Sequence, residues 1–573
     1  MPAAERAYRA VLASAPRHFG ALQLLGLLKA QQRQFSEAYR LLSKALDLEP
    51  GSVAALSTLA GVLVALGRES EALAACDRIL AQQPNDVDTH YNRGLVLVRL
   101  GRLAEALAAY DRALALKPDL PVALLNRANV LAELERYDEA IAAFDRLLAR
   151  NAGNAEAHNN RGLALFGAGR HAEALASYDR ALAIRPDYAE AHNNRGWLLH
   201  RLNRHDEALA AYDRALAIRP DYADASNNRG LALHEVHRHA EALASYARTL
   251  AIRPDFAEAR FNQSLTQLCV GDLRSGWPNY EWRWKTKKST APWRDFREPL
   301  WLGGESLEGR TILLHAEQGF GDTLHFARYI PQVARRGARV VLELQPALIA
   351  LLAELDGVSA TVERGAPLPA FDCHCPLGSL PLAFATELAT IPAAVPYLPT
   401  DPARVAHWAA RLPDGRPNVG IVWCGNPNFR GDYNRSMTFA QFSAVVAKRD
   451  VAFVTLNPGL TAEDASALAD HADVLPFARD LRDFADTAAL VASLDLVITT
   501  DTAVAHLAGA LGRPVWLLLS ASPDWRWFLD REDCPWYPSA RLLRQSALGE
   551  WDPVIARVGR ELEKFIATRG ARS

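Results

Sequence analysis

Two short segments place polar side chains at the start of a predicted helix, directly after a predicted buried strand. In the first, Gly319-Phe-Gly321-Asp322 follows TILLH at 311–315. A carboxylate near a helix N-terminus is stabilised in its ionised form by the helix dipole, so Asp322 could accept a proton from a nearby hydroxyl. His325 lies one turn later on the same helix face. The alternative is that Asp322 only caps the helix, and the residues themselves do not decide between the two interpretations.

The second segment is Asp501-Thr502-Ala503, which follows DLVITT at 495–500 and opens the predicted helix AHLAGALG. Backbone N–H groups at such a helix start form an anion site, and those of Thr502 and Ala503 would point at a diphosphate. We expect Asp501 to cap this helix and His506 to face the same cleft one turn later.

Arginines follow another predicted strand of the same half of the chain. The loop CGNPNFRGDYNRS at 424–436 carries Arg430 and Arg435 just beyond a strand end. A guanidinium in this position can offset the charge of a phosphate. Loop arginines are common, so the combination with the two helix starts carries more weight than either feature alone.

The elements that must position these residues alternate between strand and helix after Arg310. One series contains the strand at 311–315, a helix from about Asp322 to Arg335 and the strand VVLEL at 340–344. A second series has strands at 419–423, 451–456, 495–500 and 514–519, and a closing helix at about 551–567 that could pack across the cleft. This pattern predicts two doubly wound α/β lobes, at 310–400 and 417–573, joined by a linker at 401–416. We expect residues 322 and 502 to face each other across a gap between the lobes that has the size of a sugar nucleotide.

The first half of the chain repeats with a period of 34 residues. The repeat is marked by Pro16, Pro50, Pro84, Pro118, Pro186, Pro220 and Pro254. Small residues and aromatic residues recur in the same phase, as a helix hairpin requires where its two helices cross. The pattern resembles the tetratricopeptide repeat, with seven full units at 19–256, a partial unit before them and a degenerate one after them. We therefore predict an all-α superhelix over residues 1–284.

Asparagines in the same phase form a row along one predicted face of the repeats. They are Asn92, Asn126, Asn160, Asn194, Asn228 and Asn262. A carboxamide both donates and accepts hydrogen bonds, so the row could hold the backbone of an extended peptide. The row resembles the asparagine ladder of O-linked N-acetylglucosamine transferase. The alternative is that each asparagine bonds to the adjacent repeat and fixes the stacking.

An aromatic junction separates the two halves. Five of the 13 tryptophans fall within residues 277–301, and the predicted junction covers 285–309. These rings could stack on sugars, but rings at such a boundary more often join one domain to another.

The composition argues against several classes of partner. The net charge of -2 gives no basic excess for nucleic acid or anionic lipid, and neither a signal peptide nor a membrane span is indicated. We expect a cytoplasmic protein. The six cysteines are scattered, and Cys373-His-Cys375 lacks a second pair at zinc spacing, so we expect buried free thiols and no metal site.

The segments GFGDTLHFARYIP at 319–331 and DLVITTDTAVAHLAGALGRPVWLL at 495–518 resemble the signature segments of heptosyltransferase-type glycosyltransferases of the GT-B fold. The resemblance implies that Asp322 is the catalytic base, that Thr502, Ala503 and His506 contact the diphosphate of a nucleotide sugar, and that Arg435 lies near a phosphate. We count His325 as a second candidate catalytic residue, and Gly319, Gly321 and Asp501 as further candidate contacts of the nucleotide sugar. The sequence departs from the family at Ala503, where glycine is common, and at SASPDWRWF, 520–528, where a Gly-Pro-Thr turn is usual.

The repeats followed by such a domain resemble bacterial tetratricopeptide-repeat glycosyltransferases that modify proteins such as flagellin. This resemblance predicts an inverting, metal-independent transferase without a cofactor, which moves a sugar from a nucleotide-sugar donor to a Ser or Thr hydroxyl. The rival interpretation is a scaffold or chaperone whose transferase domain has degenerated. A third possibility is a lipid-linked saccharide as the acceptor.

Overall fold

The computed structural model describes residues 2–286, 294–426, 432–448, 450–457, 459–471 and 473–570. The chain divides into two compact units, residues 1–225 and 226–573. The division falls within α14 (Ala223–Glu235). The last repeat helices therefore belong to the same compact unit as the α/β part. The domain boundaries predicted at 284 and 309 mark the change from helix pairs to strands and stay predictions.

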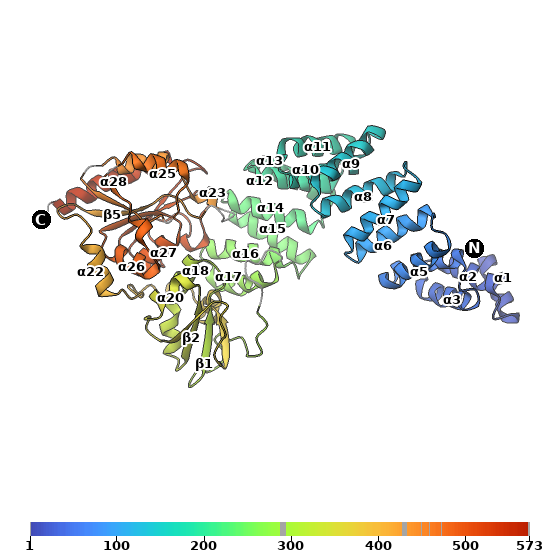
Figure 1. Cartoon of the computed structure of the whole chain (residues 1–573), viewed down its shortest axis with the longest axis horizontal. Coiled ribbons are helices and arrows are strands. Elements are labelled where there is room, and N and C mark those ends of the chain that lie inside the picture. The colour runs from blue at the N-terminus through green and yellow to red at the C-terminus, as the bar shows by residue number, and fades with distance from the viewer. Residues whose placement is uncertain are drawn as a thin grey trace. The chain divides into compact units, whose positions relative to one another are not determined.

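The first unit consists of helices paired in antiparallel hairpins (Figure 1). The side chains of Ser52, Asp86 and Asn154 accept a hydrogen bond from the third residue of the helix that each precedes, which fixes where these helices begin. The helices are α1 (Pro2–Ser14), α2 (Phe19–Gln31), α3 (Phe35–Leu48), α4 (Val53–Ala65), α5 (Glu69–Gln82), α6 (Val87–Arg99), α7 (Leu103–Leu116), α8 (Pro121–Glu133), α9 (Tyr137–Arg150), α10 (Ala155–Gly167), α11 (His171–Ile184), α12 (Ala189–Arg201) and α13 (His205–Ile218).

Close packing within each hairpin explains the small residues of the repeat. A Cβ atom added at Gly94 would lie 2.4 Å from Cε1 of Tyr110, and one added at Gly162 would lie 2.6 Å from Cε1 of Tyr178. The aromatic ring therefore occupies the space that the glycine leaves, and both tyrosines are fully buried. This geometry confirms the tetratricopeptide hairpins.

A position between the two helices of each hairpin adopts a left-handed backbone conformation. The residues with this positive φ are Arg33, Gly67, Gly101, Glu135, Gly169, Asn203, His237 and Gly271, spaced by 34. Only half of them are glycine, although glycine adopts this conformation most readily.

The second unit begins with the end of the repeats. The helices are α15 (His239–Ile252), α16 (Ala257–Cys269) and α17 (Leu273–Tyr280), followed by the 3-10 helix η1 (Glu281–Lys285). Helix α17 has 8 residues and contains Pro278, whereas α15 has 14 residues. The proline ends the regular repeat pattern, as its missing N–H predicts.

The α/β part contains two parallel sheets. The first has the strand order β3-β2-β1-β4, and the second has the order β10-β9-β8-β5-β6-β7. In both, the chain moves outward from the first strand and then crosses to its other side, which creates a switch point at β1/β4 and at β5/β8. The strands are β1 (Thr311–His315), β2 (Arg339–Leu344), β3 (Val358–Glu363), β4 (Cys373–Pro376), β5 (Asn418–Val422), β6 (Ala452–Thr455), β7 (Val474–Leu475), β8 (Leu496–Thr500), β9 (Val515–Leu519) and β10 (Ala540–Arg544). The predicted GT-B arrangement of two Rossmann-like lobes is confirmed.

Helices cover both sheets. They are α18 (Phe320–Phe326), η2 (Ala327–Tyr329), α19 (Ile330–Ala334), α20 (Pro346–Leu352), η3 (Leu377–Ser379), α21 (Leu380–Ala383), η4 (Leu388–Thr390), α22 (Pro402–Ala409), α23 (Asp432–Arg435), α24 (Phe439–Val446), α25 (Ala462–Ala469), η5 (Phe477–Asp480), α26 (Phe484–Ala492), α27 (Ala503–Ala510), η6 (Trp525–Trp527) and α28 (Asp552–Gly570). None of the helices in the described ranges is both long and apolar enough to cross a bilayer.

Two predicted helices differ from the structure. The helix expected from about Asp322 to Arg335 is broken into α18, η2 and α19, with Pro331 in the last piece. The closing helix α28 packs against α24 and β10 of the second lobe, through residues such as Val554 and Val558. It does not lie across the cleft, because its apolar face is buried on its own lobe.

The aromatic junction is partly described, since residues 287–293 lie outside the described ranges. Trp277 and Trp301 are buried in the core of the second unit, and the indole of Trp277 donates a hydrogen bond to the carbonyl of Thr386 at 2.9 Å. Trp277 of helix α17 is thus bonded to the first lobe, as expected of rings that join one domain to another.

Candidate functional site

Asp322 lies in the first turn of α18, just beyond the carboxyl end of β1. Its Oδ2 accepts a hydrogen bond of 2.9 Å from the backbone N–H of Gly319. Its Oδ1 accepts a hydrogen bond from the Nη2 of Arg526. One oxygen thus caps the helix while the other faces a cation from the second lobe, so the capping interpretation does not exclude a chemical role.

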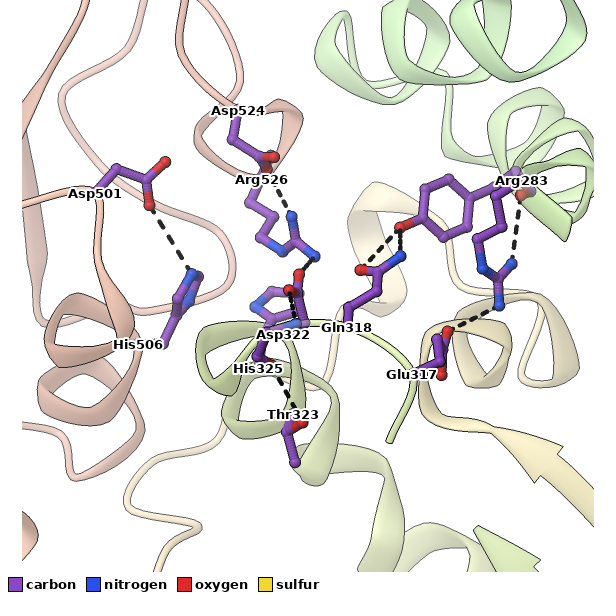
Figure 2. Close-up of polar contacts among 12 residues, drawn as sticks. Arg283, Glu317, Gln318, Asp322, Thr323, His325, Asp501, His506, Asp524 and Arg526 are labelled. Atoms are coloured by element: carbon purple, nitrogen blue, oxygen red, sulfur yellow. Dashed lines mark hydrogen bonds and ion pairs between the residues drawn. The ribbon is translucent and has the colours of Figure 1, made fainter. Parts of the chain in front are cut away.

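Arg526 is a site residue that the sequence interpretation missed. It belongs to η6, is 5% exposed, and donates a second hydrogen bond to Oδ1 of Asp524 at 2.8 Å. Figure 2 shows its guanidinium between the carboxylates of Asp322 and Asp524. The sequence signal for Arg526 was the segment SASPDWRWF, 520–528. It stands where a Gly-Pro-Thr turn is usual in the transferases that the sequence resembles.

The electrostatic setting of Asp322 differs from the sequence expectation. Burial raises the pKa of Asp322 above its ordinary value, and the nearby Arg526 opposes this shift without cancelling it. The helix dipole was expected to favour the ionised form, but desolvation outweighs it. A carboxylate with a raised pKa is a stronger base for a hydroxyl proton.

His325 lies in the interior. It has no exposed surface, and its Nδ1 lies 3.1 Å from the hydroxyl of Tyr537. Its ring packs against Trp536 with a centroid distance of 4.6 Å, and burial lowers its pKa well below the ordinary value. The ring is therefore neutral and enclosed, which suits a positioning role better than the expected catalytic role.

The second helix start is α27. Its first cap position is Thr502, which makes no side-chain cap hydrogen bond, so the prediction that Asp501 caps this helix is wrong. Asp501 instead lies 4.0 Å from Nε2 of His506, and burial together with Asp524 raises its pKa to about 6. Without a side-chain cap, the first N–H groups of α27 remain suited to an anion.

Arg435 lies beside this helix start. Its Nη1 donates to the backbone carbonyl of Asp501 at 2.8 Å, and its Nε donates to Asp432 at 3.0 Å. The structure therefore brings the guanidinium to the carboxyl end of β8, where phosphate recognition was predicted. Arg430 lies outside the described residues.

The two helix starts meet directly, so the expected gap of sugar-nucleotide size is not present in this structure. A Cβ atom added at Gly321 would lie 2.7 Å from Cδ2 of His506 and 3.5 Å from Cα of Ala503. His506 is 6% exposed, stacks on Trp527 at 5.1 Å, and its Nδ1 lies 2.9 Å from the hydroxyl of Tyr537. The side chain of His506 therefore closes the space between α18 and α27.

A small pocket remains beside Asp322. It is lined by residues 316–318, 322, 323, 326, 377 and 378, and it leaves no room for a water molecule. A substrate can therefore reach Asp322 only after the surrounding side chains or the lobes move apart.

The end of the repeats borders the same loop. Nε2 of Gln318 donates to the hydroxyl of Tyr280 at 2.9 Å, and Arg283 donates to Oε1 of Glu317 at 2.9 Å. The ring of Trp277 meets that of Trp525 edge to face at 5.2 Å. The final repeat, the loop before Asp322 and the segment carrying Arg526 thus converge on one place (Figure 2).

The asparagine row forms hydrogen bonds between repeats. Asn160 donates to Asn129, Asn194 to Asn159 and Asn262 to Asn227, at 3.0, 3.0 and 3.2 Å. Asn126 donates to the hydroxyl of Tyr91 at 3.1 Å, whereas Asn228 accepts from its neighbour Asn227 within the same helix at 3.4 Å, and Asn92 is exposed. The stacking interpretation therefore describes the bonds present, and peptide binding stays a prediction.

Comparisons with known proteins agree with this architecture. Tetratricopeptide repeat families match residues 29–93, 63–130, 122–154, 153–221 and 194–257. Glycosyltransferase family 9 (heptosyltransferase) matches residues 438–547, which include α27 and Arg526 but not Asp322.

Among curated proteins, protein FlbA of Caulobacter vibrioides is 30% identical over 328 residues, which are 52% of this chain and 54% of that protein. The chain thus spans about half the length of this relative. Among solved structures, a tetratricopeptide repeat protein from Parabacteroides merdae is 19% identical, with a TM-score of 0.40, and covers 44% of this chain and 98% of its own. A thermophilic tetratricopeptide repeat protein from Thermus thermophilus is 26% identical, with a TM-score of 0.29, and covers 32% and 99%. The chain therefore carries tetratricopeptide repeats followed by a heptosyltransferase-like domain of the glycosyltransferase family 9 type.

Proposed function

We propose that the protein is a glycosyltransferase that moves a sugar from a nucleotide-sugar donor to a Ser or Thr hydroxyl of a polypeptide bound by the repeats. The family 9 match in the second lobe supports the reaction class. A flagellin-like protein is the acceptor that the resemblance of the whole architecture favours.

The observation that carries the proposal is the setting of Asp322. Its carboxylate lies at the first lobe's switch point, contacts Arg526 of the second lobe, and lines a pocket next to Gln318, which the last repeat holds through Tyr280. A base that removes a proton from a polypeptide hydroxyl needs to be near both the donor-binding lobe and the acceptor-binding repeats. Asp322 is near both.

In the proposed reaction, Asp322 takes the proton of the acceptor hydroxyl, and the oxygen bonds to the anomeric carbon. The bond from that carbon to the diphosphate breaks on the opposite face, so the configuration inverts. The start of α27 and Arg435 stabilise the charge of the departing nucleoside diphosphate, and no metal ion or cofactor is required.

Arg526 links donor binding to the freeing of the base. Because Arg526 occupies Oδ1 of Asp322 and His506 closes the gap, the donor enters only when the lobes separate. A guanidinium binds phosphate oxygens as readily as a carboxylate, so the diphosphate can take Arg526 from Asp322. The carboxylate is then available to the acceptor hydroxyl.

The test is Asp322→Asn. Asparagine can still accept the hydrogen bond from Gly319, so the fold is preserved, but it cannot take a proton. Transfer should fall about a hundredfold or more while nucleotide-sugar binding remains. Nucleotide release and the mass increase on an acceptor protein, with a panel of nucleotide sugars and cell lysate, measure the activity.

Asp401→Asn is the matched control, because Asp401 also caps a helix through its side chain, at the start of α22. It should leave transfer unchanged. Near-normal turnover by Asp322→Asn would remove Asp322 from the role of base.

The closed lobe interface favours a second candidate, a binding scaffold whose transferase lobes no longer open. In that case no nucleotide sugar would bind to the wild-type protein, and no nucleotide would be released. Stable capture of a partner by the repeats, without either signal, would support the scaffold.

A further inference from the structure

We propose that Tyr537 is a positioning residue of the donor site, because its hydroxyl fixes the neutral ring of His506 in the tautomer that carries its proton on Nε2. That N–H then faces the start of α27, where the diphosphate of the donor is proposed to bind. This role rests on the proposed function and identifies the residue that orients one of the phosphate contacts.

The hydroxyl of Tyr537 joins two histidines from different lobes. It lies 3.1 Å from Nδ1 of His325 in α18 and 2.9 Å from Nδ1 of His506 in α27. Tyr537 and His325 have no exposed surface, and His506 is 6% exposed, so bulk water does not compete for these hydrogen bonds. Which group donates in each bond depends on where each imidazole carries its proton.

Both imidazoles are neutral at neutral pH. Burial lowers the pKa of His325 and that of His506 well below the ordinary value, and the cations of Arg328 and Arg526 lower both further. A neutral imidazole has one N–H and one bare nitrogen, so the surroundings of Nε2 decide whether Nδ1 donates or accepts.

Asp501 decides the tautomer of His506. Its Oδ1 lies 4.0 Å from Nε2 of His506, and Figure 2 shows the carboxylate facing the ring. Burial raises the pKa of Asp501 only to about 6, so the carboxyl group is ionised above that pH. A carboxylate attracts an N–H at this distance and repels a bare nitrogen. The proton of His506 is therefore on Nε2, and its Nδ1 is an acceptor.

The proton of the Tyr537 hydroxyl is then committed to Nδ1 of His506. Because a phenol has a single O–H, His325 must donate its Nδ1–H to the oxygen of Tyr537. Nε2 of His325 is then bare, and none of the described residues forms a hydrogen bond with it. The charged groups that act on His325 are Arg328 and Arg526, whose positive charges favour a bare nitrogen over an N–H. The chain from His325 through Tyr537 to His506 thus has one direction.

Tyr537 stays with His506 when the lobes separate. It lies in the second lobe between η6 and β10, and its ring packs against α27, where a Cβ atom added at Gly509 would lie 2.5 Å from Cδ1 of Tyr537. His325 belongs to the first lobe, so opening of the lobes breaks the bond to His325 and keeps the bond to His506. The Nε2–H of His506 therefore remains directed at the start of α27 while a donor enters.

NMR of the full-length protein labelled with ¹⁵N-histidine tests the chain without a sugar donor. Protonated and bare imidazole nitrogens have well separated resonances, and the variants His325→Gln and His506→Gln assign the signals. In the wild type, above the pKa of Asp501, we expect a bare Nδ1 and a protonated Nε2 in His506. We expect the reverse in His325.

Tyr537→Phe keeps the ring and removes only the hydroxyl. Both Nδ1 atoms lose their common partner, so the Nδ1 signals of His325 and His506 should shift, and a share of His506 should adopt the other tautomer. Tyr329→Phe is the matched control, because Tyr329 is also fully buried and its hydroxyl lies 2.8 Å from that of Thr386 instead of a histidine. This control should leave the signals of both histidines unchanged.

Inorganic pyrophosphate is the probe for the diphosphate. Added to the wild-type protein, it should shift the Nε2 signal of His506. Tyr537→Phe should bind pyrophosphate roughly tenfold more weakly, which is the contribution of a well-oriented hydrogen bond to a charged group.

A protonated Nδ1 of His506 in the wild type would overturn the proposal. So would histidine signals that are the same in Tyr537→Phe and the wild type, or that change equally in Tyr537→Phe and Tyr329→Phe. The role in the donor site is refuted if pyrophosphate leaves Nε2 of His506 unchanged, or if Tyr537→Phe binds pyrophosphate as tightly as the wild type. Because the tautomers are measured in the unliganded protein, they stand even if no glycosyl transfer is found, and the two proposals fail separately.

Discussion

Arg526 donates a hydrogen bond to the carboxylate of Asp322, and this ion pair joins the second lobe of the α/β part to the first. The same guanidinium bonds to Asp524 of its own lobe. Asp322 and Asp524 therefore share one buried guanidinium. A ligand phosphate that binds Arg526 in their place would leave the carboxylate of Asp322 without its counter-ion. The pair therefore couples the contents of the donor-binding lobe to the chemistry of Asp322.

Replacing Arg526 should shift the pH dependence of transfer. Burial already raises the pKa of Asp322, and Arg526 is the cation that limits this rise. In Arg526→Gln the carboxylate loses its counter-ion, so its pKa should increase further. Because the base acts in its ionised form, the acid limb of kcat/KM against pH should move to higher pH.

Arg531→Gln is the control for that experiment, because Arg531 pairs with Asp533, whose side chain is 73% exposed. Its pH profile should match the wild type. An acid limb at the same pH in Arg526→Gln and the wild type would show that Asp322 does not control the rate.

Some elements could be predicted because their signals are local. The repeat period, the strand β1 and the two helix starts follow from hydrophobic patterns, prolines and glycines within a few residues. By contrast, β3 (VSATVE) has no buried residue and β4 has only four residues, CHCP, so neither has the long apolar run by which the other strands were predicted. The repeat position with a positive φ could not be predicted from glycine, because four units have Arg33, Glu135, Asn203 or His237 there.

The site could be predicted only in part, since its decisive contacts join distant segments. Asp322 and Arg526 are 204 positions apart, and no pattern near either residue reports the other. The closure of the gap by His506 depends on the missing side chain of Gly321, a residue that was expected to contact a nucleotide sugar and not the other lobe. Long-range packing of this kind has no signature in a single sequence.

Burial of Glu317 should make stability depend on pH. Its folded-state pKa of about 7 lies above the ordinary value of 4.5, so the native protein binds this proton more tightly than the unfolded chain. Its contribution to stability is complete below about pH 4.5 and is lost as pH rises through about 7, by at most roughly 3 kcal/mol. Between about pH 5 and pH 8, the wild type should therefore lose stability relative to Glu317→Gln.

Urea denaturation followed by tryptophan fluorescence measures this difference. Of the 13 tryptophans only Trp197 precedes residue 226, so the signal reports the unit that contains Glu317. Parallel curves of stability against pH for the wild type and Glu317→Gln would contradict a raised pKa at this residue.

Adding one methyl group at Gly321 should loosen the contact between the lobes. The new Cβ would lie 2.7 Å from His506, closer than side chains pack, and overpacking of this kind costs about 1–3 kcal/mol. Gly321→Ala should therefore increase amide hydrogen exchange in α18 and α27. Gly304→Ala is the control, because nothing lies within 4 Å of its added Cβ. Unchanged exchange in α18 and α27 would show that the two helices are not held together by this contact.

Substitutions in the asparagine row can separate its role in the stacking of repeats from a role in acceptor binding. Asn160 donates to Asn129 and accepts from Asn159, which is 3% exposed, so Asn160→Ala removes the acceptor of the buried Asn159 N–H group and the donor to Asn129. Its unfolding free energy should fall by about 1–3 kcal/mol. Asn92 is exposed, so Asn92→Ala should change stability by less than about 0.5 kcal/mol.

The KM for a polypeptide acceptor in the transfer reaction shows whether the row also binds the acceptor. If the row also holds the acceptor backbone, Asn92→Ala raises the KM for the polypeptide while the melting temperature and the KM for the donor stay unchanged. An unchanged acceptor KM in Asn92→Ala, together with a loss of stability alone in Asn160→Ala, would assign the row to stacking. Because Asn126, Asn160, Asn194 and Asn262 bond across repeats, their substitution changes stability as well, and Asn92→Ala is the variant that reports acceptor binding by itself.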